Sequence, residues 1–405
     1  MTSVAMLSMH TSPLAQPGVG DSGGMNVYVR ELAASLAQGG VPTTVYVRAW
    51  DRSLPRRVDV EPGFEVVHVP AGRFDLAKED LVGVVDSFAD WVGNDIERVG
   101  ASVLHANYWL SGVAGHRLKH ELELPLVTTF HTLAAVKSST GDLESSEREE
   151  AERAIIGCSD AVCASNPVEV DQLLSLYDAE PSRIEIVPPG VDRAFFAPGD
   201  RGGARYALGL GEYPVLLFVG RIQPLKGLTV AVEALAKMAN RSARLVVVGG
   251  PSGVDGAAEL DRVHAMIRRY DLGGRVIFAP PQPHHMLSTY YRAADLTLVP
   301  SRSESFGLVA AESLACGTPI VATDVGGLSA LVEDREIGRL LADRNPAAWA
   351  CVLDELLDDP AGLRRMSIVA GERGRRFTWS TTAARLRRVY ADLSSSKVPA
   401  TCGVA

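Results

Sequence analysis

Several features that mark other classes of protein are scarce in this sequence of 405 residues. Its 5 cysteines form no C-x-x-C pair and no cysteine–histidine spacing typical of zinc, so we predict neither a disulfide framework nor a zinc site. No apolar run reaches the roughly 18 residues of a membrane span, and the first residues, MTSVAMLSMH, lack the basic flank of a signal peptide. These absences predict a cytoplasmic protein without a membrane partner.

Positive charge is also in deficit, because Lys and Arg number 40 against 49 for Asp and Glu. Proteins that bind nucleic acid carry basic patches, and no long basic run occurs here, so nucleic acid is not an expected partner. What is present is typical of a soluble globular protein: hydrophobic residues make up 46% and charged residues 22% of the chain. A chain of this length predicts two or three domains.

Short β-branched runs alternate with helical patterns along most of the chain. Most of these runs are continuously apolar, as expected of parallel strands buried on both faces. Strands that alternate with helices form β-α-β units, so we predict an α/β protein with doubly wound sheets. The predicted strands cover residues 3–9, 43–49, 64–69, 102–106, 126–130, 160–164 and 184–187 in the first half, and 215–219, 244–248, 276–279, 296–299 and 319–323 in the second.

A segment rich in glycine, proline and arginine, residues 188–214, separates the two halves. We therefore predict a Rossmann-like N-terminal domain over residues 1–195 and a second one over residues 196–379. The segment 380–405 is predicted to hold a last helix, over 380–396. Because ligands of doubly wound sheets lie outside the carboxyl ends of the strands, we expect the two domains to face each other across a ligand cleft.

The stretch GVGDSGGMNVYVRE, residues 18–31, follows the first predicted strand and is rich in glycine. One explanation is a tight turn, because glycine tolerates positive φ. Another is that a bare backbone before a helix N-terminus lets a phosphate approach closely. The helix is predicted by apolar residues at helical spacing, and Gly39-Gly40 ends it. Those apolar residues are Val29, Leu32, Ala33 and Leu36.

Two cations, Arg221 and Lys226, follow the strand predicted at 215–219. Arginine offers a planar fork of donors and lysine a compact charge, and together they suit a diphosphate. The alternative is a solvated loop with two ordinary surface charges.

Two acids, Glu304 and Glu312, lie on either side of Gly307, near which a helix is predicted to begin. The helix N-terminus favours an anion, and carboxylates accept hydrogen bonds from sugar hydroxyls. A capping box that uses Ser301 or Ser303 would explain one of these glutamates but not both.

The motifs G-R-x-Q-P-x-K-G at 220–227 and S-E-S-F-G-L-V-x-x-E at 303–312 resemble those of the retaining glycosyltransferases of family 4. This resemblance covers nearly the whole chain and implies a GT-B fold, with the C-terminal helix crossing back to the first domain. It implies a retaining hexosyltransferase in which the main chain at Gln282 meets the nucleotide base. The residues it implies for catalysis are His131, Arg221, Lys226 and Glu304. Those it implies for donor binding are Gln16, Pro17, Gly24, Arg221, Lys226, Gln282, Glu304, Ser305, Phe306, Gly307 and Glu312.

Segments of the first half, among them 131–137, resemble members of the family with a particular reaction. Those members transfer N-acetylglucosamine from UDP-N-acetylglucosamine to 1D-myo-inositol 3-phosphate, the first step of mycothiol synthesis in actinobacteria. The resemblance implies an acceptor-phosphate pocket of Lys78, Tyr108, Thr132 and Arg148; two cations and two hydroxyl donors can enclose a dianion. For Lys78 the alternative is an exposed helix start, and for Arg148 a helix with i,i+4 ion pairs. The further acceptor residues it implies are His10, Asp21, Ser22, Gly23 and Asn26.

In the expected mechanism the diphosphate leaves, and the acceptor hydroxyl attacks from the same face with a leaving phosphate oxygen as base. No carboxylate cluster lies near Arg221 and Lys226, so no metal is expected to be required for the chemistry. The resemblance implies that magnesium can bind structurally, and that a homodimer forms. The matching magnesium positions are Tyr291, Arg292, Ala294 and Thr318.

Other functions stay open at this point. The chain has His105-Ala106-Asn107-Tyr108-Trp109 where the family usually reads H-S-H-Y-W, which leaves room for another acceptor, such as an aminocyclitol or a small thiol, and for another nucleotide. A non-enzymatic module that binds nucleotide sugars is a third interpretation. A dehydrogenase is disfavoured because no G-x-G-x-x-G follows the first predicted strand.

Overall fold

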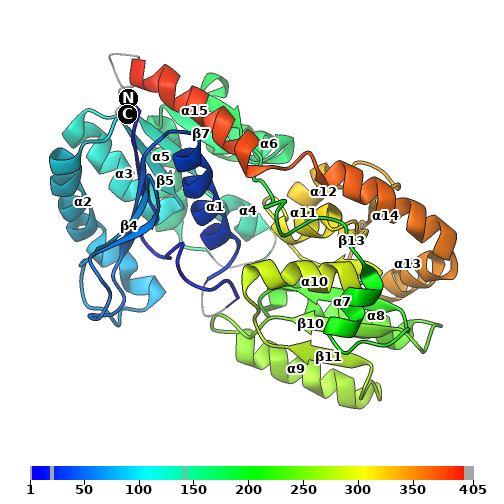
Figure 1. The fold of residues 1–405 in the computed structure, drawn as a ribbon. Coiled ribbons are helices and arrows are strands. Elements are labelled where there is room, and N and C mark those ends of the chain that lie inside the picture. Colours follow the sequence, from blue (N-terminus) through cyan, green and yellow to red (C-terminus); the bar gives the residue numbers. More distant parts are fainter. Residues whose placement is uncertain (1, 19–21, 140, 142–143, 396–405) are drawn as a thin grey trace. The chain divides into compact units, whose positions relative to one another are not determined.

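The computed structural model describes residues 2–18, 22–139, 141 and 144–395, and the chain forms two compact units (Figure 1). The first unit comprises Met1–Ala15, Met25–Gly190 and Trp379–Ala405, and the second Gln16–Gly24 and Val191–Thr378. The glycine-rich first loop thus groups with the second unit rather than with its neighbours in sequence. In the described part of the chain, no helix is long and apolar enough to cross a membrane.

The first unit is built on an eight-stranded sheet in the order β3-β4-β2-β1-β5-β6-β7-β8. All neighbours are parallel except β3 and β4, which pair in antiparallel fashion. The edge strand β3 was not predicted, because its residues RVDVE are largely polar and half-exposed. The strands are β1 (Val4–Leu7), β2 (Thr43–Arg48), β3 (Arg57–Glu61), β4 (Phe64–Val69), β5 (Val103–Asn107), β6 (Leu126–Thr129), β7 (Ala161–Ala164) and β8 (Ile184–Ile186).

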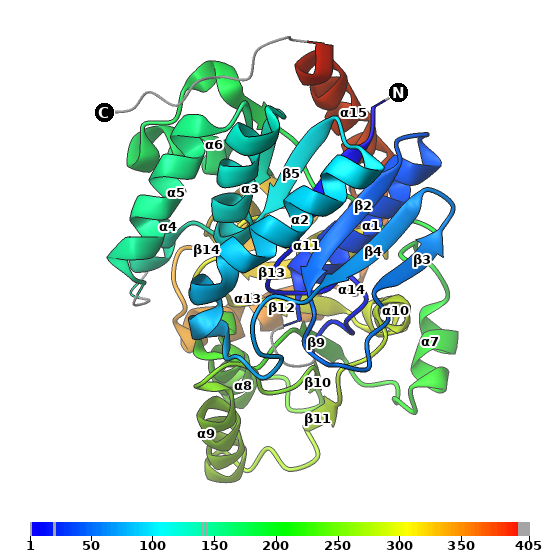
Figure 2. The same cartoon turned by 90° about the vertical axis from the view of Figure 1, so that its left-hand side faces the viewer.

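Alternating residues of β1 pack into different cores on the two faces of this sheet. Val4 and Met6 pack with α1 and α15, and Ala5 and Leu7 with α2 and α3 (Figure 2). Burial on both faces explains why β1 reads as a continuous apolar run. The helices are α1 (Gly24–Gln38), α2 (Val85–Val99), α3 (Trp109–Leu122), α4 (Ala134–Ser139), α5 (Ser146–Cys158), α6 (Pro167–Tyr177) and α15 (Trp379–Ser395), with 3-10 turns η1 (Lys78–Val84) and η2 (Pro181–Arg183).

The last helix, α15, confirms the expected return of the chain to the first unit. Leu386 and Tyr390 are fully buried there, and Trp379 packs edge-on against Tyr28 of α1 at 5.5 Å between ring centroids. This packing holds α1, the helix that follows the first loop, in the first unit.

The second unit is built on a six-stranded parallel sheet in the order β11-β10-β9-β12-β13-β14. Here, too, alternating residues face different cores: Leu216 and Phe218 of β9 lie in one, Val215 and Leu217 in the other. The strands are β9 (Val215–Val219), β10 (Arg244–Val248), β11 (Val276–Ala279), β12 (Leu296–Val299), β13 (Ile320–Thr323) and β14 (Gly338–Leu341). The helices are α7 (Arg201–Ala207), α8 (Leu228–Lys237), α9 (Gly256–Arg269), α10 (Leu287–Ala293), α11 (Leu308–Ala315), α12 (Gly327–Leu331), α13 (Pro346–Asp358) and α14 (Pro360–Gly374), with 3-10 turns η3 (Pro224–Lys226) and η4 (His284–Met286).

Strand order reverses once in each sheet, and this identifies where ligands are expected. The reversal lies at β1 and β5 in the first unit, and at β9 and β12 in the second. Crossover connections leave such a point on opposite faces of the sheet, which opens a crevice at the carboxyl ends of the strands. The loops that follow these four strands carry most of the residues predicted to be functional.

Candidate functional site

The loop after β9 packs against the loop after β12 in the second unit. Gly227 has φ of 73°, and a Cβ there would lie only 2.2 Å from the carbonyl oxygen of Pro300. The N–H of Arg302 donates to the carbonyl of Leu225 at 2.8 Å. The glycine therefore allows the close approach that brings the two predicted donor motifs together.

The predicted cation and acid from these two loops meet directly. Lys226 Nζ lies 2.7 Å from Glu304 Oε2, with 24% and 19% of the side chains exposed. The hydroxyl of Ser301 also donates to Glu304, at 3.3 Å, and the main-chain N–H of Gly327 donates to the Glu304 carbonyl at 2.9 Å. Ser301 thus hydrogen-bonds a glutamate, as the capping-box alternative supposed, but Glu304 also pairs with a lysine 78 positions away in sequence.

Glu312 is a buried acid on α11, whose N-cap is Gly307 with φ of 94°. Its Oε2 accepts from the hydroxyl of Tyr291 at 2.9 Å, and its Oε1 lies 2.7 Å from His284 Nε2. Burial, and then the carboxylate of Glu312, raises the pKa of Tyr291 well above its usual value, so the tyrosine stays a neutral donor. Sequence reasoning missed His284, although it lies two residues beyond Gln282 in the segment assigned to the nucleotide base.

The first loop supplies close backbone contacts to this region. A Cβ on Gly23 would lie 3.4 Å from Arg221 Nε, and one on Gly24 3.3 Å from Leu308 Cδ1. The distance at Gly23 is an ordinary van der Waals contact, whereas the one at Gly24 is tight, so only Gly24 supports close approach as the reason for a glycine. Asp21 lies outside the described residues.

Three other predicted residues in this unit are held by main-chain hydrogen bonds, and a fourth, Phe306, by a ring contact. The Gln16 amide donates to the Pro281 carbonyl at 3.3 Å, and the Gln282 amide to the Pro280 carbonyl at 2.8 Å. The Ser22 carbonyl accepts from the N–H of Gly18 at 2.8 Å, and Phe306 packs edge-on against Phe377. Pro17 and Ser305 are both half-buried.

In the first unit, the four residues predicted for the acceptor phosphate lie together around the ring of Tyr108. The Arg148 guanidinium lies 4.9 Å and the Lys78 ammonium 5.9 Å from the ring centroid. Arg148 Nη2 donates to Thr132 Oγ1 at 3.2 Å, and the ring of His10 lies 4.4 Å from that of Tyr108. Residues from five separate segments therefore form one cluster, which we call the Tyr108 cluster.

Arg148 is nearly fully buried, and its charge is balanced by two acids, Glu152 one turn further along α5 and Glu144 just before that helix. Nε donates to Glu152 and Nη1 to Glu144, each at 2.8 Å. Burial disfavours its charge, but Tyr108, Glu152 and Glu144 together hold the pKa of Arg148 above its usual value. The i,i+4 ion pairs considered for this residue are present, and the same guanidinium also reaches the Tyr108 cluster.

Two predicted residues have a backbone conformation that L-amino acids rarely adopt. Tyr108 has φ of 74° and His131 φ of 64°. The other described non-glycine residues with positive φ, namely Glu123, Asp178 and Asp271, all lie at or just beyond helix C-termini, where such values are common. Strained residues gather at functional sites, so the geometry of Tyr108 and His131 supports a role for both.

His131 follows β6 and is neutral at physiological pH. Burial lowers the pKa of His131 to about 3. Its Nε2 donates to Oδ1 of Asn107 at 2.9 Å, which fixes the ring, and the ring makes a T-shaped contact with that of Tyr28 at 4.7 Å between centroids. Asn26 of α1 is also buried, and its amide donates to the Ser12 carbonyl at 2.6 Å, which secures the turn after His10.

The residues implied for magnesium have no carboxylate, so a site there would use main-chain oxygens and the Thr318 hydroxyl. The Thr318 hydroxyl donates to the Tyr291 carbonyl at 2.6 Å, and Arg292 Nε donates to the Ala197 carbonyl at 2.8 Å. A structural magnesium at Tyr291, Arg292, Ala294 and Thr318 stays a prediction, and the chemistry proposed below does not depend on it.

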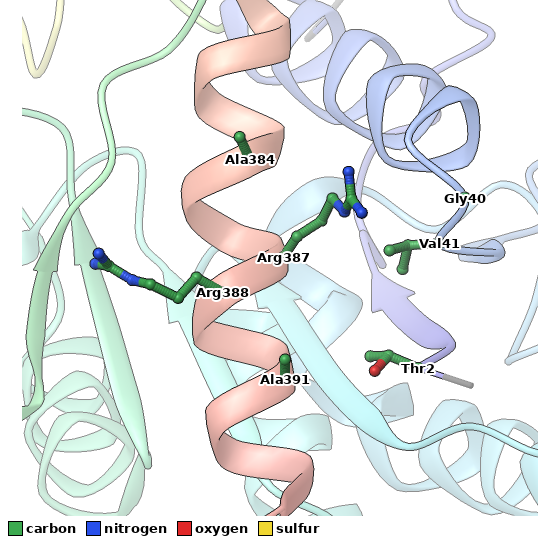
Figure 3. Close-up of a pocket in the computed structure, with 7 residues that line it drawn as sticks. All are labelled: Thr2, Gly40, Val41, Ala384, Arg387, Arg388 and Ala391. Atoms are coloured by element: carbon green, nitrogen blue, oxygen red, sulfur yellow. The ribbon is translucent and has the colours of Figure 1, made fainter.

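A cavity of about 410 Å³ opens in the first unit between α15 and the end of α1 (Figure 3). None of the residues that line it was predicted to be functional. They are Thr2, Gly40, Val41, Ala384, Arg387, Arg388 and Ala391.

Comparisons with known proteins extend over almost the whole chain. Residues 23–190 match the family described as glycosyl transferase 4-like domain, and residues 205–374 match glycosyl transferases group 1. The chain is 44% identical to D-inositol 3-phosphate glycosyltransferase 2 of Catenulispora acidiphila over 402 residues, which is 96% of this chain and 94% of that protein. It is also 44% identical to D-inositol 3-phosphate glycosyltransferase of Nocardia farcinica over 401 residues, 96% of this chain and 88% of that protein.

Solved structures agree with this on the fold. Sucrose-phosphate synthase from Thermosynechococcus elongatus superposes with a TM-score of 0.92 at 31% identity, covering 98% of this chain and 100% of that one. Anabaena HepE in complex with UDP superposes with a TM-score of 0.78 at 19% identity, covering 97% of this chain and 100% of that one. The fold is GT-B, as predicted.

Proposed function

Because the chain belongs to the family of D-inositol 3-phosphate glycosyltransferases, we propose that it transfers N-acetylglucosamine from UDP-N-acetylglucosamine to 1D-myo-inositol 3-phosphate with retention of configuration. The acceptor is the one for which these relatives are named. The donor rests on the resemblance of the motifs and on HepE, a protein of the same fold that binds UDP.

The observation that supports the acceptor best is the Tyr108 cluster. Lys78, Tyr108, Thr132 and Arg148 are distant in sequence, yet they meet around one ring and combine two cations with two hydroxyl donors. That combination suits a phosphate monoester, whereas a neutral acceptor would need neither cation.

For the donor we propose that Arg221 and Lys226 bind the diphosphate and stabilise its charge as it leaves. Such preorganised donors act on charge that develops in the transition state. Glu304, held by Lys226, would face the transferred sugar, and buried Glu312 would accept from the nucleotide ribose. The acceptor hydroxyl would attack from the face that the diphosphate leaves, with a phosphate oxygen taking its proton.

His131 would serve as a neutral hydrogen-bonding group. Because burial holds the pKa of His131 at about 3, its imidazole does not supply a proton at neutral pH. We propose that it orients the primary hydroxyl of the donor sugar, with Asn107 fixing the ring.

The test is to supply UDP-N-acetylglucosamine with inositol 3-phosphate, with inositol, or alone, and to measure UDP release. We expect release that requires inositol 3-phosphate, and a KM for it that rises at least tenfold in Lys78→Ala. Turnover with inositol at the same rate would overturn the phosphate pocket. Binding of UDP without turnover on any of these would point to a different acceptor, and no binding of nucleotide sugar would refute the donor assignment.

A homodimer is part of the same proposal, because closed two-fold dimers are the commonest assembly of soluble enzymes. Sedimentation of the purified protein tests it: a single species at twice the mass of the chain is expected, and a monomer at micromolar concentration would contradict it.

A further inference from the structure

We propose that Glu144 competes with the acceptor's phosphate, so that its carboxylate sets how tightly a phosphorylated acceptor binds. The inference rests on the proposed function, because it takes the Tyr108 cluster as the phosphate pocket. It adds two residues to that pocket, Glu144 as the competing anion and Lys137 as a further cation.

Glu144 stands between two cations of the pocket. Its Oε2 accepts from Arg148 Nη1 at 2.8 Å, and its Oε1 accepts from Lys137 Nζ. Burial opposes its ionisation, but Lys137 and Arg148 hold the pKa of Glu144 below its usual value, so the group is a carboxylate. The anion position beside Arg148 is therefore already filled by the protein.

Of the two acids on Arg148, Glu144 is the one that can leave. Glu152 is fully buried, and its Oε2 accepts from the N–H of Ala134 at 2.8 Å and from the hydroxyl of Tyr177 at 2.5 Å. Glu144 keeps 13% of its side chain exposed, and its described contacts to protein are the two cations. A phosphate that replaced it would regain both charge-assisted contacts.

The charges of the pocket agree with an exchange. Lys78, Lys137 and Arg148 carry three positive charges, and Glu152 removes one of them. The net charge of +2 matches a phosphate dianion, but with Glu144 still in place the net charge of the pocket would be only +1. A dianion that entered beside the bound carboxylate would also suffer like-charge repulsion in a partly buried site.

Replacing Glu144 by glutamine removes its charge and keeps its shape, so this variant distinguishes competition with phosphate from structural support of Arg148. In Glu144→Gln we expect the KM for inositol 3-phosphate to fall by about three- to tenfold, with the KM for UDP-N-acetylglucosamine unchanged. Inorganic phosphate should raise the melting temperature of Glu144→Gln at a lower concentration than it does in the wild type. Glu149→Gln is the matched control, since Glu149 lies on α5 next to Arg148, is 39% exposed and pairs only with Arg153 among the ion pairs of the described residues.

A KM that is unchanged or raised in Glu144→Gln would overturn the inference and make Glu144 a support for Arg148. Glu144→Ala has neither the carboxylate nor the amide that glutamine introduces. It should also lower the KM for inositol 3-phosphate, which would show that the effect does not come from the new amide. If the wild type uses no phosphorylated acceptor, the proposed function fails, whereas the phosphate-dependent melting shift still reports on Glu144 alone.

Discussion

The two regions to which we assign ligand binding are built in different ways. In the second unit, the donor region comes from two short motifs, each continuous in sequence, on the loops after adjacent strands β9 and β12. Its central contact is a single ion pair, Lys226–Glu304. In the first unit, the Tyr108 cluster draws on five segments, and its arginine belongs to a network of two acids and a second lysine.

This difference suggests how the two regions respond to change. When one partner of the single Lys226–Glu304 ion pair is lost, no second ion pair joins the same two loops among the described residues. In a network of several charges, the effect of removing one member depends on the partners that remain, so single substitutions there are read together. In the proposed function, donor binding therefore depends on two local motifs and acceptor binding on dispersed residues.

The largest effect is expected at the donor cation. Lys226→Ala should lower kcat by about 10²- to 10³-fold, because it removes a preorganised cation from the leaving diphosphate and leaves Glu304 without its ion pair. Steady-state kinetics with both substrates saturating measure it. Lys237→Ala is the control, since this lysine is 44% exposed on α8 and pairs with Glu233 at 3.5 Å. A loss below tenfold would show that the donor region, too, tolerates loss of a single charge.

A second prediction concerns Gly327, which packs against the backbone of the loop after β12. A Cβ on Gly327 would lie 2.3 Å from the Ser305 carbonyl and 2.5 Å from Phe306 Cα, and backbone cannot yield as a side chain can. Gly327→Ala should therefore cost about 2–3 kcal/mol of unfolding free energy. Gly157→Ala on α5 meets nothing within 4 Å and should instead gain about 0.5 kcal/mol. Urea unfolding of both compares them, and equal stabilities would contradict the tight packing.

The sequence was sufficient for much of the fold because most strands are buried on both faces. The predicted strands at 215–219 and 244–248 match β9 and β10 residue for residue. The missed strands are edges: β3 is polar, and β14, which reads GRLL, pairs only with β13. The other two edge strands, β8 and β11, were predicted, so β3 and β14 were missed because they lack the apolar run on which the prediction depended, not because they are edges.

For the site, the motifs identified residue types but not their partners. The pairing of Lys226 with Glu304 depends on the order of β9 and β12, which no local pattern encodes. The contacts of His284 and Glu144 depend equally on packing, and each residue reads in sequence as an ordinary surface group. Pairwise contacts across a sheet were therefore beyond sequence reasoning.

A third prediction tests the buried histidine behind the Tyr108 cluster. Burial lowers the pKa of His105 to about 3, and its ring bonds Tyr390 at 2.6 Å and Thr129 at 2.9 Å. The unfolded chain takes up a proton near pH 6.5 and the folded one does not, so stability is full above that pH and is lost as pH falls. His105 alone should cost about 1.4 kcal/mol at pH 5.5.

Urea unfolding at pH 7.5 and pH 5.5 measures this loss. In His105→Gln the difference between the two pH values should shrink by about 1.4 kcal/mol, whatever the stability of the variant itself. His285→Gln, at an exposed position, should leave the difference as it is in the wild type. An unchanged difference in His105→Gln would mean that this histidine is protonated in the folded protein.

The smallest effect is expected from His284, which we predict to be a positioning residue for Glu312. It occupies one carboxylate oxygen at 2.7 Å while Tyr291 occupies the other, so losing it frees the acid to rotate without removing it. His284→Ala should raise the KM for the nucleotide-sugar donor by about fivefold with kcat nearly unchanged, since a single hydrogen bond is worth about 1 kcal/mol.

His284→Gln, which keeps a side-chain donor, should restore most of that affinity. If His284 were merely structural, both His284→Ala and His284→Gln would lower kcat and the melting temperature, and glutamine would not rescue them. If His284→Ala changed only the KM for the acceptor, the contrast between the two regions would fail, because a residue of the second unit would then affect acceptor binding. The donor region would then be as dispersed in its effects as the Tyr108 cluster, in spite of its local motifs.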